Sequence, residues 1–532
     1  MTDHTTTQAQ REQFVTDMTE RMASLARTLV NWVTSEPRTL GQIEQLLVRT
    51  SKDLGAALLA GLCHLTVPTY PAASLPCACG ATALYQRLRP ATVKTVLDTI
   101  TFSRPYYLCP SCHHGFSPLD QQLQFCAGSR SAALDELLAL LGATQDSFVQ
   151  AAQVLHRLTL VHVCANSVRD ATEQLGAVLL AQPPQPLTEP SSAPECPSST
   201  RRPTQLYISM DGVLVHLHQR GWSEIKVGCC YQTRSCLDRS RPEQLDIRAH
   251  SASYVSALEQ AQSFGWRLWQ EALRRGALTA DELVLLGDGA HWIWALGQAH
   301  FARATQILDW YHASEYVWNA ASAIWGEASA ERCDWAQAQL DKLWESKVAE
   351  VLVELERWRE RGGAVLAALS YYTEHQSRMD YASYRARGLQ IGSGSVESAC
   401  KQLVTARLKQ AGMIWNAEGA EAVGMVRAWL KSERWEEAMA LRGVRTRSYR
   451  RKQAAQEGER GKEAGQAEQT QARVPLKPQA KARQELSAEM LAQVRAELAE
   501  QRGKSVWRRS SNLQAQAERT AQTTQPRPVI AA

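Results

Sequence analysis

The sequence predicts a multidomain α+β protein: N-terminal helices, a small cysteine-containing module and a second helical region, then a larger α/β domain. Three observations predict this class. The chain has 532 residues, enough for several domains. Apolar residues recur at helical spacing in some segments and alternate at strand spacing in others. Residues 181–203 are rich in Pro and Ser and poor in apolar residues, so we expect a linker between two halves.

The N-terminal region, residues 1–70, is predicted to be helical. Apolar residues such as Phe14, Met18 and Leu25 follow helical spacing, and Pro37 interrupts the pattern. We therefore expect two or three helices here.

Residues 71–125 are predicted to form a zinc-ribbon-like module of short strands. They contain the pairs Cys77-x-Cys79 and Cys109-x₂-Cys112, which offer four thiolates to one structural Zn²⁺ in tetrahedral geometry. The first pair is spaced more tightly than usual, so other side chains remain alternative ligands, namely Cys63, His64, His113 and His114. The alternative without metal is a set of reduced structural thiols.

Residues 131–180 return to helical spacing, and the last two helices of this region are predicted to form a helix-turn-helix. The start of its second helix would then read DNA bases. The side chains expected to do so are Asn166, Ser167, Arg169 and Gln174. Pairs of helices are also common in any helical core, which is the alternative.

Residues 204–435 are predicted to form the α/β domain. Alternating apolar residues indicate paired strands over 205–218 and 222–233, and the apolar run in 281–289 indicates a buried strand. We expect a helix over 253–276, a further strand within 304–312 and a mostly helical insertion over about 313–387. The turn IGSGS then introduces a helix over 396–410, with Ser395 as its N-cap.

Three acidic residues of this domain are candidates for chemistry. Asp211 and Asp288 each end an apolar strand and precede a glycine, and Glu397 lies near a helix start. A cluster of acids repels itself unless cations neutralise it, and Mg²⁺ prefers carboxylate oxygens. Two such ions promote phosphodiester transfer. The alternative is that each acid is an ordinary turn or helix-start residue.

Four segments of the sequence, MDG, LGDGAHWIW, LDWYHASEYVW and IGSGSVESACKQLVTARLKQAGMIW, resemble the DDE-type transposases of bacterial insertion sequences, closest to the ISKra type. The resemblance covers most of residues 70–432. It implies a ribonuclease-H-like catalytic domain with a helical insertion, in which Asp211, Asp288 and Glu397 are catalytic and hold two Mg²⁺ or Mn²⁺ ions. It also implies that the protein cuts DNA strands and rejoins them.

Asp309 and His312 form a D-x-x-H pattern that is similar to one in related, Mutator-like transposases. We take them as a secondary site, where His312 would contact a scissile phosphate or support a carboxylate. The alternative is a histidine at a helix start, bonded to nearby backbone.

Basic residues supply candidate phosphate contacts. Those on the Glu397 helix are Lys401, Arg407 and Lys409, whose alternative is a solvated helix face. Residues 441–532 carry 19 basic and 9 acidic side chains, a net +10, whereas residues 1–440 carry 40 basic and 45 acidic ones, a net −5. We expect residues 445–532 to be a mostly disordered basic tail that adds nonspecific DNA affinity or is simply solvated.

The sequence thus predicts a DNA transposase that binds insertion-sequence ends and catalyses metal-dependent cleavage and strand transfer. Its expected partners are double-stranded DNA and further copies of itself assembled on DNA. No membrane partner is expected, and the predicted location is the cytoplasm, because no apolar run or targeting pattern is evident. The alternatives are a noncatalytic, transposase-derived DNA-binding protein and a nuclease of the same fold without strand transfer.

Overall fold

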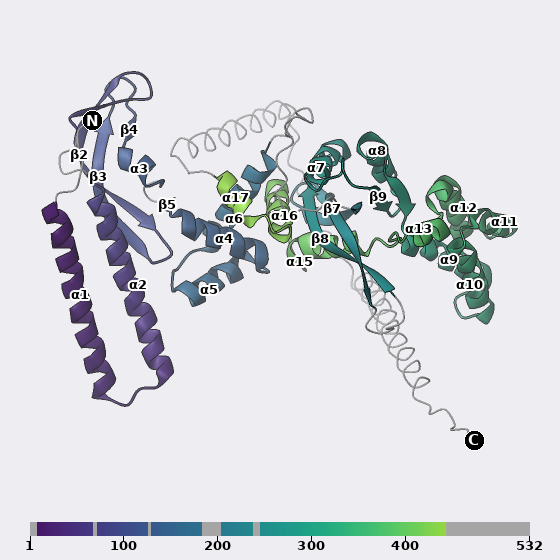
Figure 1. The fold of residues 1–532 in the computed structure, drawn as a ribbon, viewed down its shortest axis with the longest axis horizontal. Coiled ribbons are helices and arrows are strands. Elements are labelled where there is room, and N and C mark those ends of the chain that lie inside the picture. Colours follow the sequence, from purple (N-terminus) through teal and green to yellow (C-terminus); the bar gives the residue numbers. More distant parts are fainter. Residues whose placement is uncertain (1–7, 68–71, 126–128, 183–203, 238–244, 443–532) are drawn as a thin grey trace, which may run out of the picture. The chain divides into compact units, whose positions relative to one another are not determined.

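The structure is a computed structural model that describes residues 8–67, 72–125, 129–182, 204–237 and 245–442 (Figure 1). It is a mixed α+β protein with two five-stranded sheets, which confirms the predicted class at this level. The predicted tail, and the predicted linker from residue 183 onwards, lie outside the described residues. Among the helices of the described ranges, none is long and apolar enough to cross a membrane.

The N-terminal region consists of two long helices, α1 (Gln8–Ser35) and α2 (Leu40–Leu65), which run side by side in opposite directions (Figure 1). Thr39 caps α2, because its side chain accepts the Gln42 backbone N–H while the Gln42 side chain accepts that of Thr39. Two helices with a break around Pro37 confirm the sequence prediction. Neither helix has a buried residue.

The cysteine module is built on a β-hairpin whose two strands pair antiparallel, and α2 packs on it. Buried Val93 and Phe102 of the hairpin contact Leu59 and Ala60 of α2. The strands are β1 (Ser74–Pro76), β2 (Thr82–Lys94), β3 (Thr99–Leu108), β4 (Gly115–Phe116) and β5 (Ser129–Arg130), and the short helix α3 spans Pro118–Gln122.

Three helices follow the hairpin module: α4 (Ala132–Thr144), α5 (Phe148–Thr159) and α6 (Ala165–Leu180). The predicted helix-turn-helix corresponds to α5 and α6. However, α6 packs against both α4 and a helix near the end of the described chain, α16 (Ala417–Lys431). The approach to α16 is so close that a Cβ on Gly176 would lie 2.4 Å from the Ala422 carbonyl oxygen. One side of α6 is therefore part of the core.

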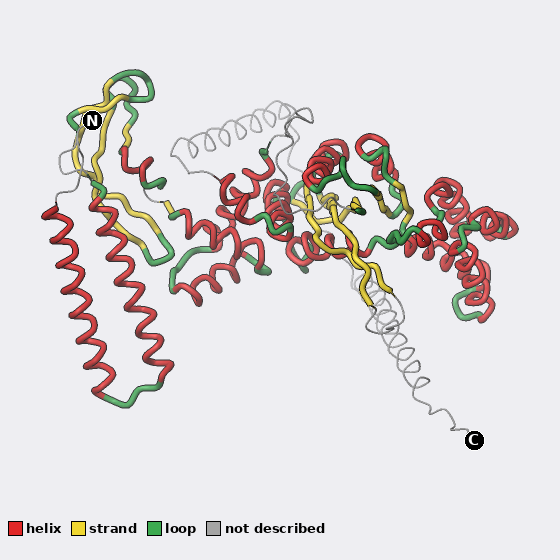
Figure 2. Tube along the Cα trace, viewed as in Figure 1, coloured by secondary structure: helices red, strands yellow, loops and turns green. Residues whose placement is uncertain are grey.

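The second sheet, whose strands are yellow in Figure 2, has the strand order β10-β9-β6-β7-β8. It carries the main hydrophobic core. Its three longest strands pair antiparallel, whereas β9 runs parallel to β6 and β10 parallel to β9. The strands are β6 (Gln205–Leu217), β7 (Gly221–Leu237), β8 (Leu245–Ala257), β9 (Glu282–Gly287) and β10 (Thr305–Leu308). The strands predicted over 205–218, 222–233 and 281–289 are confirmed.

The helix predicted over 253–276 starts later than expected. Residues up to Ala257 belong to β8, and the helix α7 spans Ala261–Arg274. Ser253 and Ala257 are fully buried, and Ala257 pairs with Lys226 of β7. Pairing with a distant strand thus outweighs the local helical pattern, which is a common reason for such errors.

The remaining elements are helical. After α8 (His291–His300) and β10, the predicted insertion contains α9 (Trp310–Trp325), α10 (Ala330–Trp344), α11 (Val348–Arg357), α12 (Gly363–His375) and α13 (Tyr381–Ala386). Then come α14 (Gly394–Cys400), a π-helical turn η4 (Lys401–Thr405), α15 (Ala406–Leu408), α16 and α17 (Trp435–Arg442). The N-cap of α14 is Ser393 rather than the predicted Ser395.

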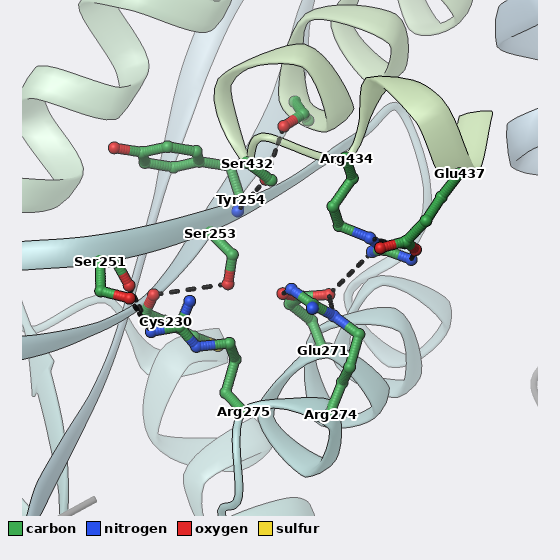
Figure 3. Close-up of polar contacts among 11 residues, drawn as sticks. Cys230, Ser251, Ser253, Tyr254, Glu271, Arg274, Arg275, Ser432, Arg434 and Glu437 are labelled. Carbon is green, nitrogen blue, oxygen red and sulfur yellow. Dashed lines mark hydrogen bonds and ion pairs between the residues drawn. The ribbon is translucent and has the colours of Figure 1, made fainter. Parts of the chain in front are cut away.

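A polar network fastens the start of α17 to the second sheet and its covering helix (Figure 3). The buried Glu271 of α7 contacts Arg274 and Arg434, and Arg434 also contacts Glu437. Nearby, the Tyr254 backbone N–H of β8 donates to Ser432 Oγ at 2.8 Å. The two guanidinium groups offset the cost of removing the Glu271 carboxylate from water, so the charges of this network can be buried together.

Candidate functional site

Two of the candidate acids follow neighbouring parallel strands directly. Asp288 comes after Gly287, the last residue of β9, and Asp309 comes after Leu308, the last residue of β10. Leu308 pairs with Gly287, and the Asp309 backbone N–H donates to the Gly287 carbonyl oxygen at 2.8 Å. Because the carboxyl ends of parallel strands share one edge of a sheet, the two aspartates are neighbours there.

Asp211 reaches the same edge from β6, although it lies inside that strand rather than at its end as predicted. The parallel pairing of β6 with β9 stops at Ser209, so Asp211 stands just beyond the end of β9. Burial raises the pKa of Asp211; the Gly212 N–H, which donates to its Oδ1 at 2.6 Å, opposes this rise, and the negative charge of Asp288 adds to it.

Glu397 lies on α14, and Asp309 accepts a hydrogen bond from the turn before that helix. The Ser393 backbone N–H donates to Asp309 Oδ1 at 2.6 Å, and Ser393 Oγ donates to Glu397 Oε1 at 3.0 Å. One turn after Glu397, the Cys400 thiol donates to Asp211 Oδ2 at 3.5 Å. The structure therefore brings the three predicted acids to one edge of the sheet, which we call the carboxylate edge.

His312 lies beside these acids as a cation. Its Nδ1 donates to Asp309 Oδ2 at 2.6 Å, and its backbone N–H donates to the same oxygen at 2.8 Å. The hydrogen bond to Asp309 raises the pKa of His312 to about 9; partial burial opposes the rise, and the charges of Asp309 and Asp288 support it. The side chain is thus bonded to a fully buried carboxylate and not to backbone, the alternative left open by the sequence.

Two further groups support the site and were not predicted. Tyr371 of α12 donates from its hydroxyl to the Asp288 carbonyl oxygen at 2.6 Å. Gly289 has φ +106°, and a Cβ there would lie 2.6 Å from the Tyr371 ring, so only glycine suits this position. The Asp-Gly pair in the sequence predicts a turn at Gly289. No local sequence pattern links Tyr371 to Asp288, which lies 83 positions earlier.

The three acids differ from the four cysteines in how closely they approach one another. Within the described part of the chain, only Cys77, Cys79, Cys109 and Cys112 form a set of candidate ligand atoms all within 4.8 Å. Asp211 and Asp288 are half-buried, and burial together with the charge of Asp288 keeps the pKa of Asp211 raised although the charge of His312 opposes this. Carboxylate oxygens are the ligands that Mg²⁺ prefers.

The cysteine cluster comes from two tight turns, one before β2 and one before β4. The Sγ atoms of Cys77 and Cys112 lie 3.5 Å apart, and those of Cys79 and Cys109 lie 3.7 Å apart. The Cys112 N–H, which points to the sulfur of Cys109, lowers the pKa of Cys109 to about 6 and favours its thiolate. The predicted four residues can thus hold a metal ion. The alternative ligand Cys63 packs against the β-hairpin instead.

The predicted DNA-reading side chains lie on α6: Asn166, Ser167 and Arg169 near its start and Gln174 in its middle. Asn166 and Arg169 are exposed, whereas Ser167 and Gln174 are half-buried. The Oε1 atom of Gln174 is buried without a hydrogen-bond partner among the described residues. The exposed candidates Asn166 and Arg169 are therefore accessible from solvent, whereas Gln174 is largely covered.

On the helix of Glu397, Lys401 and Lys409 are exposed, but Arg407 is only 2% exposed. Its Nε donates to the Gly142 carbonyl oxygen at 3.2 Å, and its guanidinium lies over the Phe148 and Trp415 rings. The expectation that Arg407 contacts phosphate is corrected: the preceding π-helical turn and the packing of α4 place it in the core.

A family model matches residues 83–439, and its description is "Uncharacterised protein family (UPF0236)". The chain belongs to this family. A search of curated proteins finds no match. The residues shared with UPF0236 include the whole carboxylate edge together with Cys109 and Cys112, whereas Cys77, Cys79 and both N-terminal helices precede the matched range.

Proposed function

We propose that the protein is a DNA transposase that binds insertion-sequence ends and performs divalent-metal-dependent cleavage and strand transfer. The observation that carries this proposal is the meeting of Asp211, Asp288 and Glu397 at one sheet edge, from three elements spread over 187 residues. Acids of an ordinary turn or helix start have no reason to meet in this way.

The topology of the second sheet supports a ribonuclease-H-like assignment. Three antiparallel strands continue into two parallel ones, with α7 crossing between β8 and β9, and a helical segment separates Asp288 from Glu397. This is the arrangement that the resemblance to DDE transposases implies.

In the proposed reaction the three carboxylates hold two Mg²⁺ or Mn²⁺ ions, which when bound promote ionisation of the attacking hydroxyl and stabilise the departing 3′-oxygen. The chain's own groups orient this site. Ser393 fixes Glu397, the Cys400 thiol fixes Asp211, and Tyr371 fixes the backbone of Asp288. Cationic His312 faces the region where a scissile phosphate would lie.

The proposed partner is double-stranded DNA, contacted near the site by Lys401 and Lys409 and elsewhere by Asn166 and Arg169, with more than one copy of the protein acting on the two ends. The proposed metal of the cysteine cluster is Zn²⁺, because four thiolates in a tight set favour it. Its role would be structural, since four sulfur ligands leave no open coordination position.

The test is an assay of purified protein on a plasmid that carries the gene's flanking sequences, with Mg²⁺ or with chelator. We expect metal-dependent nicks and strand joints that disappear in Glu397→Gln and Asp211→Asn, while DNA binding persists. Glu418→Gln, an acid of α16 outside the carboxylate edge, is the matched control and should keep full activity. Nicks without joints would indicate a nuclease, and binding without any chemistry under several metals would indicate a noncatalytic DNA-binding protein.

A further inference from the structure

The helices α1 and α2 form a hairpin that does not complete a hydrophobic core by itself. Of their 28 and 26 residues, none is buried. The seam between them holds half-buried residues of α1, such as Phe14, Met18 and Leu25, and half-buried Ile43 and Leu54 of α2. Phe14 lies so close to α2 that a Cβ on Gly61 would be 2.3 Å from its ring. On another side, α2 packs on the β-hairpin through Leu59 and Ala60. The two helices can cover only one side of each other, so a complete bundle needs further helices.

A second apolar stripe lies on each helix, away from the seam. On α1 the exposed fractions are 62% for Val15, 56% for Met22, 59% for Val30 and 36% for Val33. On α2 they are 80% for Leu40, 45% for Leu47, 39% for Leu58 and 47% for Leu62. At 100° per residue, the stripe on α1 lies about 60° to 140° from the seam and the stripe on α2 about 30° to 90° from it, in the same rotational sense. Because the helices run in opposite directions, rotation in the same sense brings both stripes to one face of the α1–α2 hairpin.

This arrangement is the one that a four-helix bundle requires. In such a bundle each helix contacts two neighbours, in directions about 90° apart around its axis. Within one chain, α1 and α2 are each other's first neighbour through the seam. The exposed stripes face the direction in which each helix would contact a second neighbour. In the first half of α2, Leu40 and Leu47 of its stripe line an open, mainly apolar groove of about 780 Å³. Val96 and Leu97 form the opposite wall of this groove.

Charge and area point to a second copy of this chain as the occupant. The helix α1 carries three acidic and three basic residues, and α2 carries two of each, so neither is an attractive surface for DNA phosphates or anionic lipids. A neutral face can meet its own copy without repulsion. Helices of this length are about 40 Å long and 10 Å wide, so the two together offer roughly 800 Å², the area per partner of a standard interface.

We infer that two copies of the protein associate through the α1–α2 face to form a four-helix bundle. This inference does not rest on the proposed transposase activity: it concerns residues outside the range shared with UPF0236 and predicts association without DNA. When the same face of two copies pairs about a two-fold axis, both faces are used up and the assembly stops at a dimer.

The test measures the mass of the full chain by light scattering after gel filtration, without DNA and in high salt. We expect twice the monomer mass of 59.1 kDa. Met22→Glu combined with Leu47→Glu, which puts charge on both stripes, should weaken the dimer by more than about tenfold. Ser24→Glu combined with Gln45→Glu adds the same charge to exposed positions of the same helices outside the stripes and should leave the dimer intact.

Far-UV circular dichroism checks that both variants keep their helices, which we expect because all four positions are exposed. Val15→Glu combined with Leu58→Glu provides a second disruption if the first variant fails to fold. A monomeric wild-type protein at micromolar concentration would overturn the inference. So would a dimer that both stripe variants leave unchanged, or binding of the hairpin to anionic vesicles with no self-association.

Discussion

The cysteine cluster and the carboxylate edge both gather side chains of one chemical kind from separate segments of the chain, but their surroundings differ. The cysteine cluster has a core of only four buried residues, two of them the ligands Cys77 and Cys109. The carboxylate edge stands on a five-stranded sheet with a continuous core. A small module usually needs its metal ion to fold. A domain with a large hydrophobic core can instead tolerate half-buried acids that repel one another, even without a metal ion. The two sites should therefore respond in opposite ways to loss of their ligands.

The largest effect is expected at the cysteine cluster. Cys109→Ser should abolish zinc binding and unfold the module around it, because the ion supplies on the order of 10 kcal/mol in small zinc domains. Metal analysis and thermal unfolding of the purified protein measure both effects. Cys333→Ser, a change at an exposed cysteine outside the cluster, should alter neither. Full zinc content in Cys109→Ser would show that other ligands hold the metal.

Asp309→Asn should give the next largest effect, a loss of about 2 to 3 kcal/mol in the free energy of unfolding. The fully buried carboxylate accepts bonds from Ser393 and from His312, and the amide cannot replace both charge-assisted bonds. Urea denaturation measures the change. Asp341→Asn, at an exposed residue that accepts one side-chain bond, is the control and should stay within about 0.5 kcal/mol of wild type. Equal losses in the two variants would contradict the anchoring role of Asp309.

Asp211→Asn should raise the free energy of unfolding, by less than Asp309→Asn lowers it. Burial raises the pKa of Asp211, so its charge costs stability once the pH exceeds the raised pKa, and the neutral amide removes that cost. We expect the metal-free variant to be more stable than wild type by about 1 kcal/mol at neutral pH. Stabilisation by added Mg²⁺ should disappear at the same time. Thermal unfolding with chelator and with Mg²⁺ tests both, and a destabilised metal-free variant would refute the comparison.

The smallest effect concerns His312 and pH. Its pKa is about 9 in the folded protein and lower when unfolded, so its contribution is fully present below about pH 6.5 and is lost as the pH rises through 9. The imidazole is partly exposed, so the contribution should be below about 1 kcal/mol. The difference in unfolding free energy between wild type and His312→Gln, measured from pH 6 to 10, isolates it. A difference that grows with pH would contradict the ion pair with Asp309.

Much of the carboxylate edge could be predicted because its residues carry local patterns. Apolar runs before Asp211 and Asp288 predict the strands that position them, and the D-x-x-H pattern places Asp309 and His312 at a strand-to-helix junction. The supporting residues could not be predicted in this way. Tyr371 and Cys400 act through bonds to groups far away in sequence, and nothing in their own neighbourhood distinguishes them from core residues.

The sequence by itself determined the two close cysteine pairs, the two N-terminal helices and most strands of the second sheet, because these follow from spacing within a few residues. Only the tertiary structure decided that Ser253 to Ala257 extend β8, that Arg407 is buried beneath α4, and that α6 packs on α16. Each of these outcomes depends on contacts between residues more than twenty positions apart. Their free energy outweighs local propensity, which amounts to only fractions of a kcal/mol per residue.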